Sequence, residues 1–370
     1  MDFMIRDVES MKKKIVFIIL SLFGGGAERV VSILANALAG RNWNVSVILY
    51  QRKQWEYPLS ENVKLHVLPS FEQDNPIAKR VKYIAHIRKI LTEEKADVVL
   101  PFLAIPTVHT FFASRGLKCR FIATVRNNPD RYPDQRCLRL LVNCCTVRAD
   151  CVMYQTEEQK SFFQKAKNTF IVHNPVNPDM LKADFPYRAA VTNIASFGRL
   201  SVQKDHQLLI RAFSRIAAEY PQVSLQIFGE GEERAELERL IAQLELCGRV
   251  WLMGSTDHVL ERMLQSDIFV LSSAYEGLPN ALMEAMAVGL PCVSTRCPTG
   301  PGDLIDDGEN GILVPVGDET AMADALRKLM DDSGLRKRLG TNARQKIADQ
   351  YTVERVISDF VQELERQIAG

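Results

Sequence analysis

Short apolar runs alternate with amphipathic stretches of helical length along this chain, and the alternation starts twice. The runs occupy residues 15–20, 45–50, 63–68, 97–101, 121–125 and 151–154, and then 193–197, 223–228, 249–253, 267–273 and 291–294. Strands that alternate with helices predict parallel sheets covered by helices on both faces. The two series therefore predict an α/β protein with two Rossmann-like domains.

A segment without periodicity separates the two series. It begins with two prolines in HNPVNP (residues 173–178) and continues as a polar run to residue 190, which is typical of a linker. We predict an amino-terminal domain at residues 1–175, a linker at 176–190 and a carboxy-terminal domain at 191–351. The last segment, 352–370, has the pattern of a helix, and we expect it to pack back on the first domain. A chain of 370 residues can form two cores of ordinary size.

The first apolar run follows three lysines (KKKIVFIIL) and so imitates a secretory signal. Amphipathic residues follow at once without an A-x-A cleavage site, so we interpret residues 15–20 as a buried strand after a short polar leader. No run reaches the ~18–20 apolar residues of a membrane span. We expect a cytoplasmic protein.

Charge is distributed unevenly between the two halves. Residues 1–185 hold 27 Lys and Arg against 18 Asp and Glu, whereas residues 186–370 hold 19 against 27, for a net charge of +1. A basic first half indicates an anionic partner on that side. The eight cysteines show neither CxxC nor zinc-ligand spacing, which favours reduced structural thiols. We predict neither a metal nor a cofactor.

Two loops have the features of phosphate sites. Gly24, Gly25 and Gly26 lie between the first strand and an amphipathic helix, where bare backbone can approach an anion. This is not a GxGxxG dinucleotide motif, and a tight turn would explain the glycines equally well. In the second half, GRLSVQKDH places Arg199 and Lys204 after a strand. Each alone could be a solvated charge, but together they suit a diphosphate.

The stretch LSSAYEGLPNALMEAMAVG (residues 271–289) places Glu276 and Glu284 eight positions apart. We predict a strand, a Gly-Pro loop and a helix that is capped by Asn280 and ends at Gly289. A helix amino terminus attracts anions, and the two carboxylates can accept hydrogen bonds from hydroxyl groups. Phosphate beside polyol is the chemistry of a nucleotide sugar; the competing interpretation is an acidic first turn that only satisfies the helix dipole.

These motifs, in this order, resemble glycosyltransferase family 4. The matching pieces are FGRLSVQKDHQLLI, FGEGEER, SSAYEGLPNALMEAMAVGLP and CPTGPGDLIDDGENGILVPVGD, with GGGAERV in the first half. The resemblance implies a GT-B fold, in which two Rossmann-like domains face a central cleft. It also implies a retaining, metal-independent transferase that uses a nucleotide diphosphate sugar.

The resemblance assigns roles to particular positions. Arg199 and Lys204 would hold the donor diphosphate, Glu276 would face the transferred sugar, and Glu284 would hold the ribose hydroxyls. The other residues expected at the donor are Gly25, Gly26, Gly229, Glu230, Gly277, Leu278, Pro279 and Asn280.

One position departs from the family pattern. Many members have a His after the strand that corresponds to residues 121–125, where this chain has Arg126, Asn127 and Asn128. An arginine cannot shuttle a proton near neutral pH. We therefore expect Arg126 to clamp an anion or hydroxyl on the acceptor side, with Asn127 and Asn128 beside it. A plain surface loop is the competing interpretation.

A basic helix, AKRVKYIAHIRKIL (residues 78–91), is compatible with a plain surface helix or with contact to an anionic membrane surface. The latter suits a peripheral enzyme on the inner face of the plasma membrane. Nucleic acid fits poorly, because no known module accompanies the charge.

We therefore expect transfer of a hexose or N-acetylhexosamine, with UDP as the expected nucleotide, to a lipid-linked or polysaccharide acceptor. The alternatives are a nucleotide-sugar-binding protein without transfer activity and a nucleotide-sugar epimerase.

Overall fold

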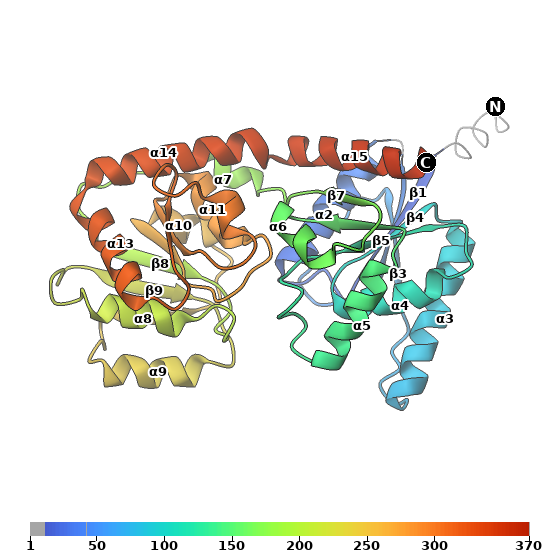
Figure 1. The fold of residues 1–370 in the computed structure, drawn as a ribbon, viewed down its shortest axis with the longest axis horizontal. Helices are drawn as coiled ribbons and strands as arrows, with labels where there is room; N and C mark the ends of the chain where they lie inside the picture. The colour runs from blue at the N-terminus through green and yellow to red at the C-terminus, as the bar shows by residue number, and fades with distance from the viewer. Residues whose placement is uncertain (1–11, 42, 370) are drawn as a thin grey trace. The chain divides into compact units, whose positions relative to one another are not determined.

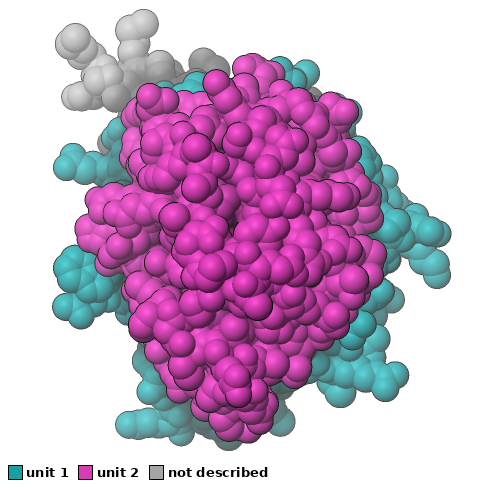
Figure 2. Space-filling model, turned by 90° about the vertical axis from the view of Figure 1, so that its left-hand side faces the viewer, with its two compact units in different colours: residues 1–175, 354–370 teal, residues 176–353 magenta. Residues whose placement is uncertain are grey.

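The computed structural model describes residues 12–41 and 43–369, which form two compact units (Figure 1). The first unit comprises the chain up to residue 175 together with 354–370, and the second comprises 176–353. Figure 2 colours the two units teal and magenta. Residues 1–11 of the predicted leader lie outside the described residues, whereas Lys12 is described and Lys13 and Lys14 already belong to the first strand. Residues 176–190, predicted as a linker, belong to the second unit and contain a short helix.

The first unit is built on a seven-stranded sheet in the order β3-β2-β1-β4-β5-β6-β7, and neighbouring strands are parallel. Its strands are β1 (Lys13–Ile19), β2 (Trp43–Leu49), β3 (Val63–Val67), β4 (Val98–Pro101), β5 (Arg120–Thr124), β6 (Cys151–Tyr154) and β7 (Thr169–Ile171). Residues 15–19 of β1 are fully buried in the middle of the sheet, which confirms the prediction of a core strand there.

Helices connect these strands and cover the sheet. They are α2 (Gly26–Ala39), α3 (Pro76–Glu94), α4 (Ala104–Ser114), α5 (Arg136–Val147), α6 (Glu157–Lys160), the 3₁₀ turn η1 (Ser161–Phe163) and α15 (Val353–Ala369). Helices α3, α4 and α5 pack side by side (Figure 1). The predicted stripe of α15 is buried at Val356, Phe360 and Leu364.

The second unit repeats the design with a six-stranded parallel sheet in the order β10-β9-β8-β11-β12-β13. Its strands are β8 (Asn193–Phe197), β9 (Ser224–Phe228), β10 (Val250–Gly254), β11 (Ile268–Leu271), β12 (Cys292–Thr295) and β13 (Ile312–Val314). Its helices are α7 (Pro178–Lys182), α8 (His206–Ser214), α9 (Arg234–Gln243), α10 (Val259–Leu264), α11 (Asn280–Val288), α12 (Pro301–Leu304), α13 (Glu319–Asp331) and α14 (Ser333–Gln350).

The two faces of this sheet carry separate cores. Side chains of α8, α9 and α13 fill one core, and those of α7, α10, α11 and α14 fill the other. Central strands such as β11, which is buried at each position, are apolar throughout because both faces lie against helices. This architecture explains why continuous apolar runs, and not alternating ones, marked the strands in the sequence.

Several predicted helix bounds are wrong. The helical patterns of the sequence predict helices at 206–220 and 156–165, but the first ends at Ser214 and continues as turns, and the second is a single turn followed by η1. Asn280 is not the N-cap of α11: Pro279 is, and no side chain caps this helix. The cause is local, because proline at the boundary fixes the extended conformation that a cap requires. Gly289 does end the helix in the left-handed conformation, as predicted.

Within the described ranges, no helix combines the length and apolarity that crossing a bilayer requires.

Candidate functional site

Four loops of the second unit follow neighbouring strands and meet at the carboxyl edge of the sheet. They are residues 198–205 after β8, 229–233 after β9, 272–279 after β11 and 296–300 after β12. The strand order reverses at β8, which lies between β9 and β11. Ligands of open parallel sheets bind at such a reversal point, beyond the carboxyl ends of the strands.

Glu276 lies at the centre of these loops and is only 5% exposed. Its Oε1 atom accepts a hydrogen bond from Lys204 Nζ at 2.6 Å and another from Ser273 Oγ at 2.6 Å. Gln203 donates to Glu276 Oε2 at 3.4 Å and to the Tyr275 carbonyl at 3.0 Å. A buried carboxylate needs such partners. The structure thus joins Lys204 and Glu276, which the sequence assigned to different parts of the donor.

The two loops that carry this pair are also tied through their backbones. Ala274 N–H donates to the Gln203 carbonyl at 2.8 Å, and Ser272 Oγ donates to the Lys204 carbonyl at 2.9 Å. The ammonium group of Lys204 is therefore held in position from both ends of its side chain, and little conformational entropy remains to be lost when it meets an anion.

Arg199 lies on the same loop as Lys204 and is exposed. Within the part of the chain that the structure describes, its guanidinium group has no hydrogen bond or ion pair. A free guanidinium with five donors beside a fixed ammonium can form a bidentate contact with a phosphate group.

The glycine loop after β9 packs directly on the loop after β8. A Cβ atom on Gly229 would lie 2.0 Å from the Gly198 carbonyl oxygen, and one on Gly231 would lie 2.2 Å from that of Leu200. Leu200 N–H also donates to the Glu230 carbonyl at 3.0 Å. These glycines act through contact with the loop of Arg199 and Lys204, whereas the Glu230 side chain pairs with Arg234 at 3.1 Å.

The loop before α11 is held by residues 299–300. Thr299 Oγ1 donates to the Glu276 carbonyl, and a Cβ atom on Gly300 would lie 1.7 Å from the carbonyl oxygen of Gly277. Leu278 and Pro279 are buried, Asn280 is partly exposed, and the Glu284 side chain is buried on α11. The sequence did not identify Thr299 or Gly300 individually.

Burial sets the protonation of two further groups beside the site. His206, the first residue of α8, is 3% exposed; burial, followed by the charge of Lys204, lowers its pKa to about 4. Burial, followed by the charge of Glu276, raises the pKa of the Cys297 thiol to about 12. Both groups are therefore neutral at neutral pH, and neither competes with Lys204 for Glu276.

In the first unit, a carboxylate lies beside the predicted phosphate loop. A Cβ atom on Gly25 would lie 1.9 Å from Glu28 Oε2, so Glu28 folds back over the amino terminus of α2, where a negative charge is favoured. Burial raises the pKa of Glu28. Gly26 is the first residue of α2. The glycines thus already face an anionic side chain, which the sequence pattern did not reveal.

The acceptor-side residues follow β5. Arg126 stacks on the ring of Phe102, with Cζ 4.5 Å from the ring centroid, and donates from Nη1 to Asn174 Oδ1 at 3.1 Å. Its Nε and Nη2 atoms are buried and have no hydrogen-bond partner among the described residues. Burial lowers the pKa of the guanidinium to about 9, so it stays charged at neutral pH. A small cavity of about 40 Å³ adjoins it, enough for about one water molecule.

Asn127 and Asn128 are engaged within their own turn. Asn127 Oδ1 accepts from Asn128 N–H at 2.8 Å, and Asn128 Oδ1 accepts from Asp130 N–H at 2.9 Å. Asn128 is 3% exposed. The asparagines therefore shape the loop that carries Arg126, and the amide oxygen of Asn127 has one hydrogen bond before any acceptor arrives.

Sequence reasoning missed the partners that fix Glu276. Ser273 and Gln203 lie within quoted stretches, but a serine or glutamine in a loop carries no pattern of its own. Among the described residues, no group of three His, Cys, Asp or Glu side chains is placed to hold a metal ion.

Two family models match the chain, one in each half. Residues 24–180 match Glycosyltransferase Family 4, and residues 191–346 match Glycosyl transferases group 1. Each match contains the loops described above for its half.

Named relatives extend over almost the whole chain. A GalNAc-α-(1→4)-GalNAc-α-(1→3)-diNAcBac-PP-undecaprenol α-1,4-N-acetyl-D-galactosaminyltransferase of Campylobacter jejuni is 30% identical over 343 residues, 91% of this chain and 94% of the relative. The lipopolysaccharide core biosynthesis glycosyltransferase LpsE of Rhizobium meliloti is 29% identical, over 91% of this chain and 95% of the relative.

Solved structures share the fold. Sucrose-phosphate synthase from Thermosynechococcus elongatus superposes with a TM-score of 0.84 at 20% identity, covering 97% of this chain and 100% of that one. Anabaena Alr3699/HepE, in complex with UDP and glucose, superposes with a TM-score of 0.82 at 19% identity, covering 95% and 99%. The fold is therefore GT-B, and the chain belongs to the family 4 type of glycosyltransferases.

Proposed function

We propose that this glycosyltransferase moves a hexose or N-acetylhexosamine from a UDP-linked donor, with retention at the anomeric carbon, to a lipid-linked or polysaccharide acceptor. The observation that carries the proposal is the Glu276–Lys204 pair, with N···O at 2.6 Å, together with Arg199 on the loop of Lys204, whose exposed guanidinium has no partner among the described residues. This one group of loops supplies two cations for a leaving diphosphate, Arg199 and Lys204, and a carboxylate for a sugar hydroxyl, Glu276.

The reaction requires charge to be stabilised where it develops. The bond between the anomeric carbon and the diphosphate oxygen breaks, the acceptor oxygen bonds to that carbon on the same face, and its proton passes to the leaving diphosphate. Arg199 and Lys204 stabilise the growing negative charge, which is usually the largest catalytic contribution. The backbone amides of Gly25 and Gly26 are proposed to bind the diphosphate as well. The side chain of Glu28 then has to move away from these glycines.

Residues at the same edge of the sheet are proposed to make the remaining contacts with the donor. Glu284, buried on α11, is proposed to accept from the ribose hydroxyls, and Glu276 to orient the transferred sugar. Backbone from Gly277 to Asn280 lines the sugar and phosphate. Gly229 and Glu230 lie toward the nucleoside, because their loop packs on that of Arg199.

On the acceptor side, Arg126 is proposed to clamp a hydroxyl or anionic group, using the Nε and Nη2 donors that have no protein partner. Asn127 and Asn128 hold its loop. Because an arginine stays protonated near neutral pH, this residue does not act as the base, which supports proton transfer to the leaving diphosphate.

The comparisons support the substrate classes. The name of the Campylobacter jejuni relative describes N-acetylgalactosamine transfer to an undecaprenol diphosphate-linked glycan, and the Anabaena structures hold UDP or UDP-glucose. We infer a comparable donor and a glycolipid acceptor for this chain, and a place at the cytoplasmic face of the plasma membrane.

The first unit has a helix, α3, whose surface suits contact with a membrane. On α3, Tyr83, Ile87 and Leu91 are buried, whereas Ile77 and Val81 are 73% and 60% exposed. The helical spacing of the sequence predicts Val81, Ile84 and Leu91 on one face, but of these only Leu91 is buried. Exposed aliphatic side chains among lysines and arginines on one helix are typical of contact with an anionic lipid surface.

The test begins with a thermal-shift panel of UDP-, GDP- and ADP-sugars, followed by transfer of labelled sugar from the best donor to a lipid-linked acceptor. Lys204→Ala should lower kcat by about two to three orders of magnitude, as expected for loss of a preorganised charge contact.

Lys328→Ala is the matched control, because Lys328 is exposed on α13 of the same unit. Circular dichroism checks that the variants are folded. A folded Lys204→Ala protein with a near-normal rate would contradict the proposal.

A further inference from the structure

The first unit contains a set of cations at the amino ends of β5, β6 and β7, the edge of its own sheet opposite the one that carries Arg126. Arg120 begins β5, Asp150 immediately precedes β6, and Lys167 and Asn168 precede β7. Arg126 follows the other end of β5. A five-residue strand separates the two ends by roughly 16 Å, so these cations are distinct from the acceptor-side group.

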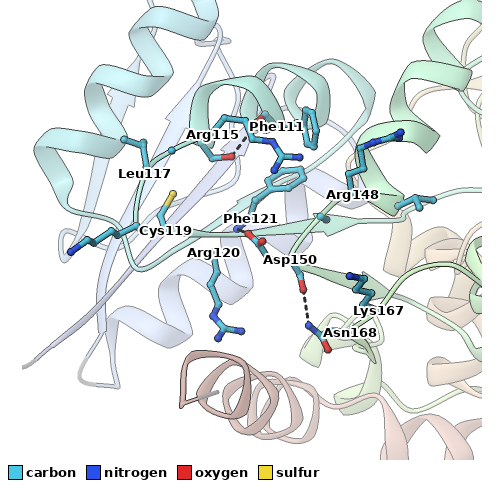
Figure 3. A pocket seen from close by; sticks show the side chains of 15 residues that line it. Phe111, Arg115, Leu117, Cys119, Arg120, Phe121, Arg148, Asp150, Lys167 and Asn168 are labelled. Carbon is cyan, nitrogen blue, oxygen red and sulfur yellow. Dashed lines mark hydrogen bonds between the residues drawn. The ribbon is translucent and has the colours of Figure 1, made fainter.

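They line a cavity of about 770 Å³, shown in Figure 3. Its cationic side chains come from α4 and the loop that follows it, from β5, from the end of α5 and from the loop before β7: Arg115, Lys118, Arg120, Arg148 and Lys167. A neighbouring cavity of about 590 Å³ shares Arg120 and Lys167 and is bordered by Arg366 on α15. Cavities of this size are typical of ligand sites.

The cations of this cavity lack carboxylate partners. Asp150 is the single acidic residue of the lining, and its Oδ2 atom already accepts from Phe121 N–H at 2.8 Å. Among the described residues, none of the five lining cations forms an ion pair, whereas Lys64 and Lys82 elsewhere in the unit pair with carboxylates at 2.7 Å. Clustered like charges repel one another, which favours an anionic ligand in the cavity.

The cavity is also partly organised for binding. The guanidinium of Arg115 stacks on Phe111, with Cζ 4.1 Å from the ring centroid, and Phe111 packs edge-on against Phe121. Arg88 donates to the carbonyls of Ala113 and Arg115 at 3.0 and 2.6 Å. These contacts hold the end of α4 in place, so Arg115 is presented from a fixed backbone (Figure 3).

We propose that this cavity binds a phosphorylated ligand through its diphosphate or clustered phosphate groups, at a site separate from the donor site. Arginine forks and lysine ammonium groups around a concave surface match the geometry and charge of phosphate oxygens. The ligand is either a soluble phosphate compound or the headgroup of an anionic lipid. This inference does not depend on the identity of the donor or acceptor.

The experiment uses inorganic pyrophosphate and isothermal titration calorimetry, with Arg199→Ala and Lys204→Ala combined as the background that removes both donor-side cations. Pyrophosphate should still bind this protein. Adding Arg120→Gln and Lys167→Gln, the two cations shared by both cavities, should weaken that binding by about tenfold or more. Lys118→Gln with Lys167→Gln is a second pair, at exposed side chains. Arg41→Gln with Lys53→Gln removes the same charge outside the cavity and should leave binding unchanged.

A parallel arm measures sedimentation with vesicles of phosphatidylcholine that contain phosphatidylglycerol. Loss of pyrophosphate binding in the cavity variants assigns the site to soluble phosphates, and loss of vesicle binding alone assigns it to lipid headgroups. The proposal is overturned if neither arm responds to the cavity variants, or if the control pair weakens binding as much as they do.

Discussion

Glu276 receives hydrogen bonds at 2.6 Å from both an ammonium and a hydroxyl group. Hydrogen bonds to a charged partner contribute about 1.5–3 kcal/mol each, whereas breaking a buried ion pair by removing one partner costs about 3–5 kcal/mol. The contact between Lys204 and Glu276 is therefore stable before a donor binds. A diphosphate has to compete with Glu276 for Lys204, so Arg199, whose guanidinium has no partner in the described part of the chain, is the cation best able to make the first contact.

His206 makes the loop of Lys204 sensitive to acid. Its pKa lies near 4 in the folded protein against an ordinary value of 6.5, so the unfolded chain binds the proton more readily. The free energy of unfolding is therefore fully retained above pH 6.5 and falls as the pH drops toward 4. At 1.36 kcal/mol per pKa unit, the loss approaches about 3 kcal/mol.

Denaturant unfolding measured across this pH range checks the prediction. His206→Leu should flatten the profile between pH 6.5 and 4, because the group that titrates is gone. His258→Leu is the control, since His258 is exposed on the same unit and its ring pairs with Glu261. A profile as steep in His206→Leu as in the unchanged protein would refute the assignment.

At the scale of elements, the donor site depends on loops packed against loops. Gly231 has no room for a side chain, because a Cβ atom would lie 2.2 Å from the backbone oxygen of Leu200. Gly231→Ala should therefore displace the loop that carries Arg199 and Lys204. A displacement of about 1 Å in a catalytic group can cost on the order of 100-fold in rate.

The measurement is kcat/KM for sugar transfer together with the melting temperature. We expect Gly231→Ala to lower kcat/KM by about ten- to one hundred-fold while the unit remains folded. Gly40→Ala is the matched control, because its nearest neighbour would lie 3.6 Å from the new Cβ atom. Equal activity in the two variants would show that the packing of these loops does not position the cations.

Some of these elements could be predicted from the sequence, and others could not. Strands such as β1 and β11 were predictable because burial on both faces leaves continuous apolar runs. The end of α8 at Ser214 was not, because the residues beyond it keep a helical pattern and continue as turns, and helix ends are the least sharply defined part of a helix. Asn280 fits the composition of a cap, but the proline before it already occupies that position.

Site residues divide in the same way. Arg199, Lys204 and Glu276 could be proposed as site residues because charged residues after strands are visible in the sequence and match a family. The contact of Lys204 with Glu276 joins residues 72 positions apart, and no local pattern predicts it. The position of Glu28 over Gly25 was also hidden, since an acidic residue in a first helical turn is ordinary.

At the scale of the whole molecule, the excess of basic residues belongs to the first unit, and α3 offers both charge and exposed aliphatic groups. If this helix contacts anionic lipid, Val81→Asp should weaken binding to vesicles that contain phosphatidylglycerol by about tenfold. The substitution removes an apolar contact and adds repulsion, and a charge near such a surface contributes ~1 kcal/mol. Transfer to a vesicle-bound acceptor should fall in parallel, whereas transfer to a water-soluble acceptor analogue should stay unchanged.

Val316→Asp provides the control for this last test, because Val316 is an exposed valine of the second unit, at 42% exposure against 60% for Val81. Binding is measured by sedimentation at low and high salt, since an electrostatic contribution weakens as ions screen it. If Val81→Asp and Val316→Asp sediment alike, α3 is a plain surface helix, and the basic character of the first unit is then left to the cavity around Arg120. If only Val81→Asp loses vesicle binding, α3 is the element that contacts lipid. The cavity around Arg120 is then assigned to a soluble phosphate.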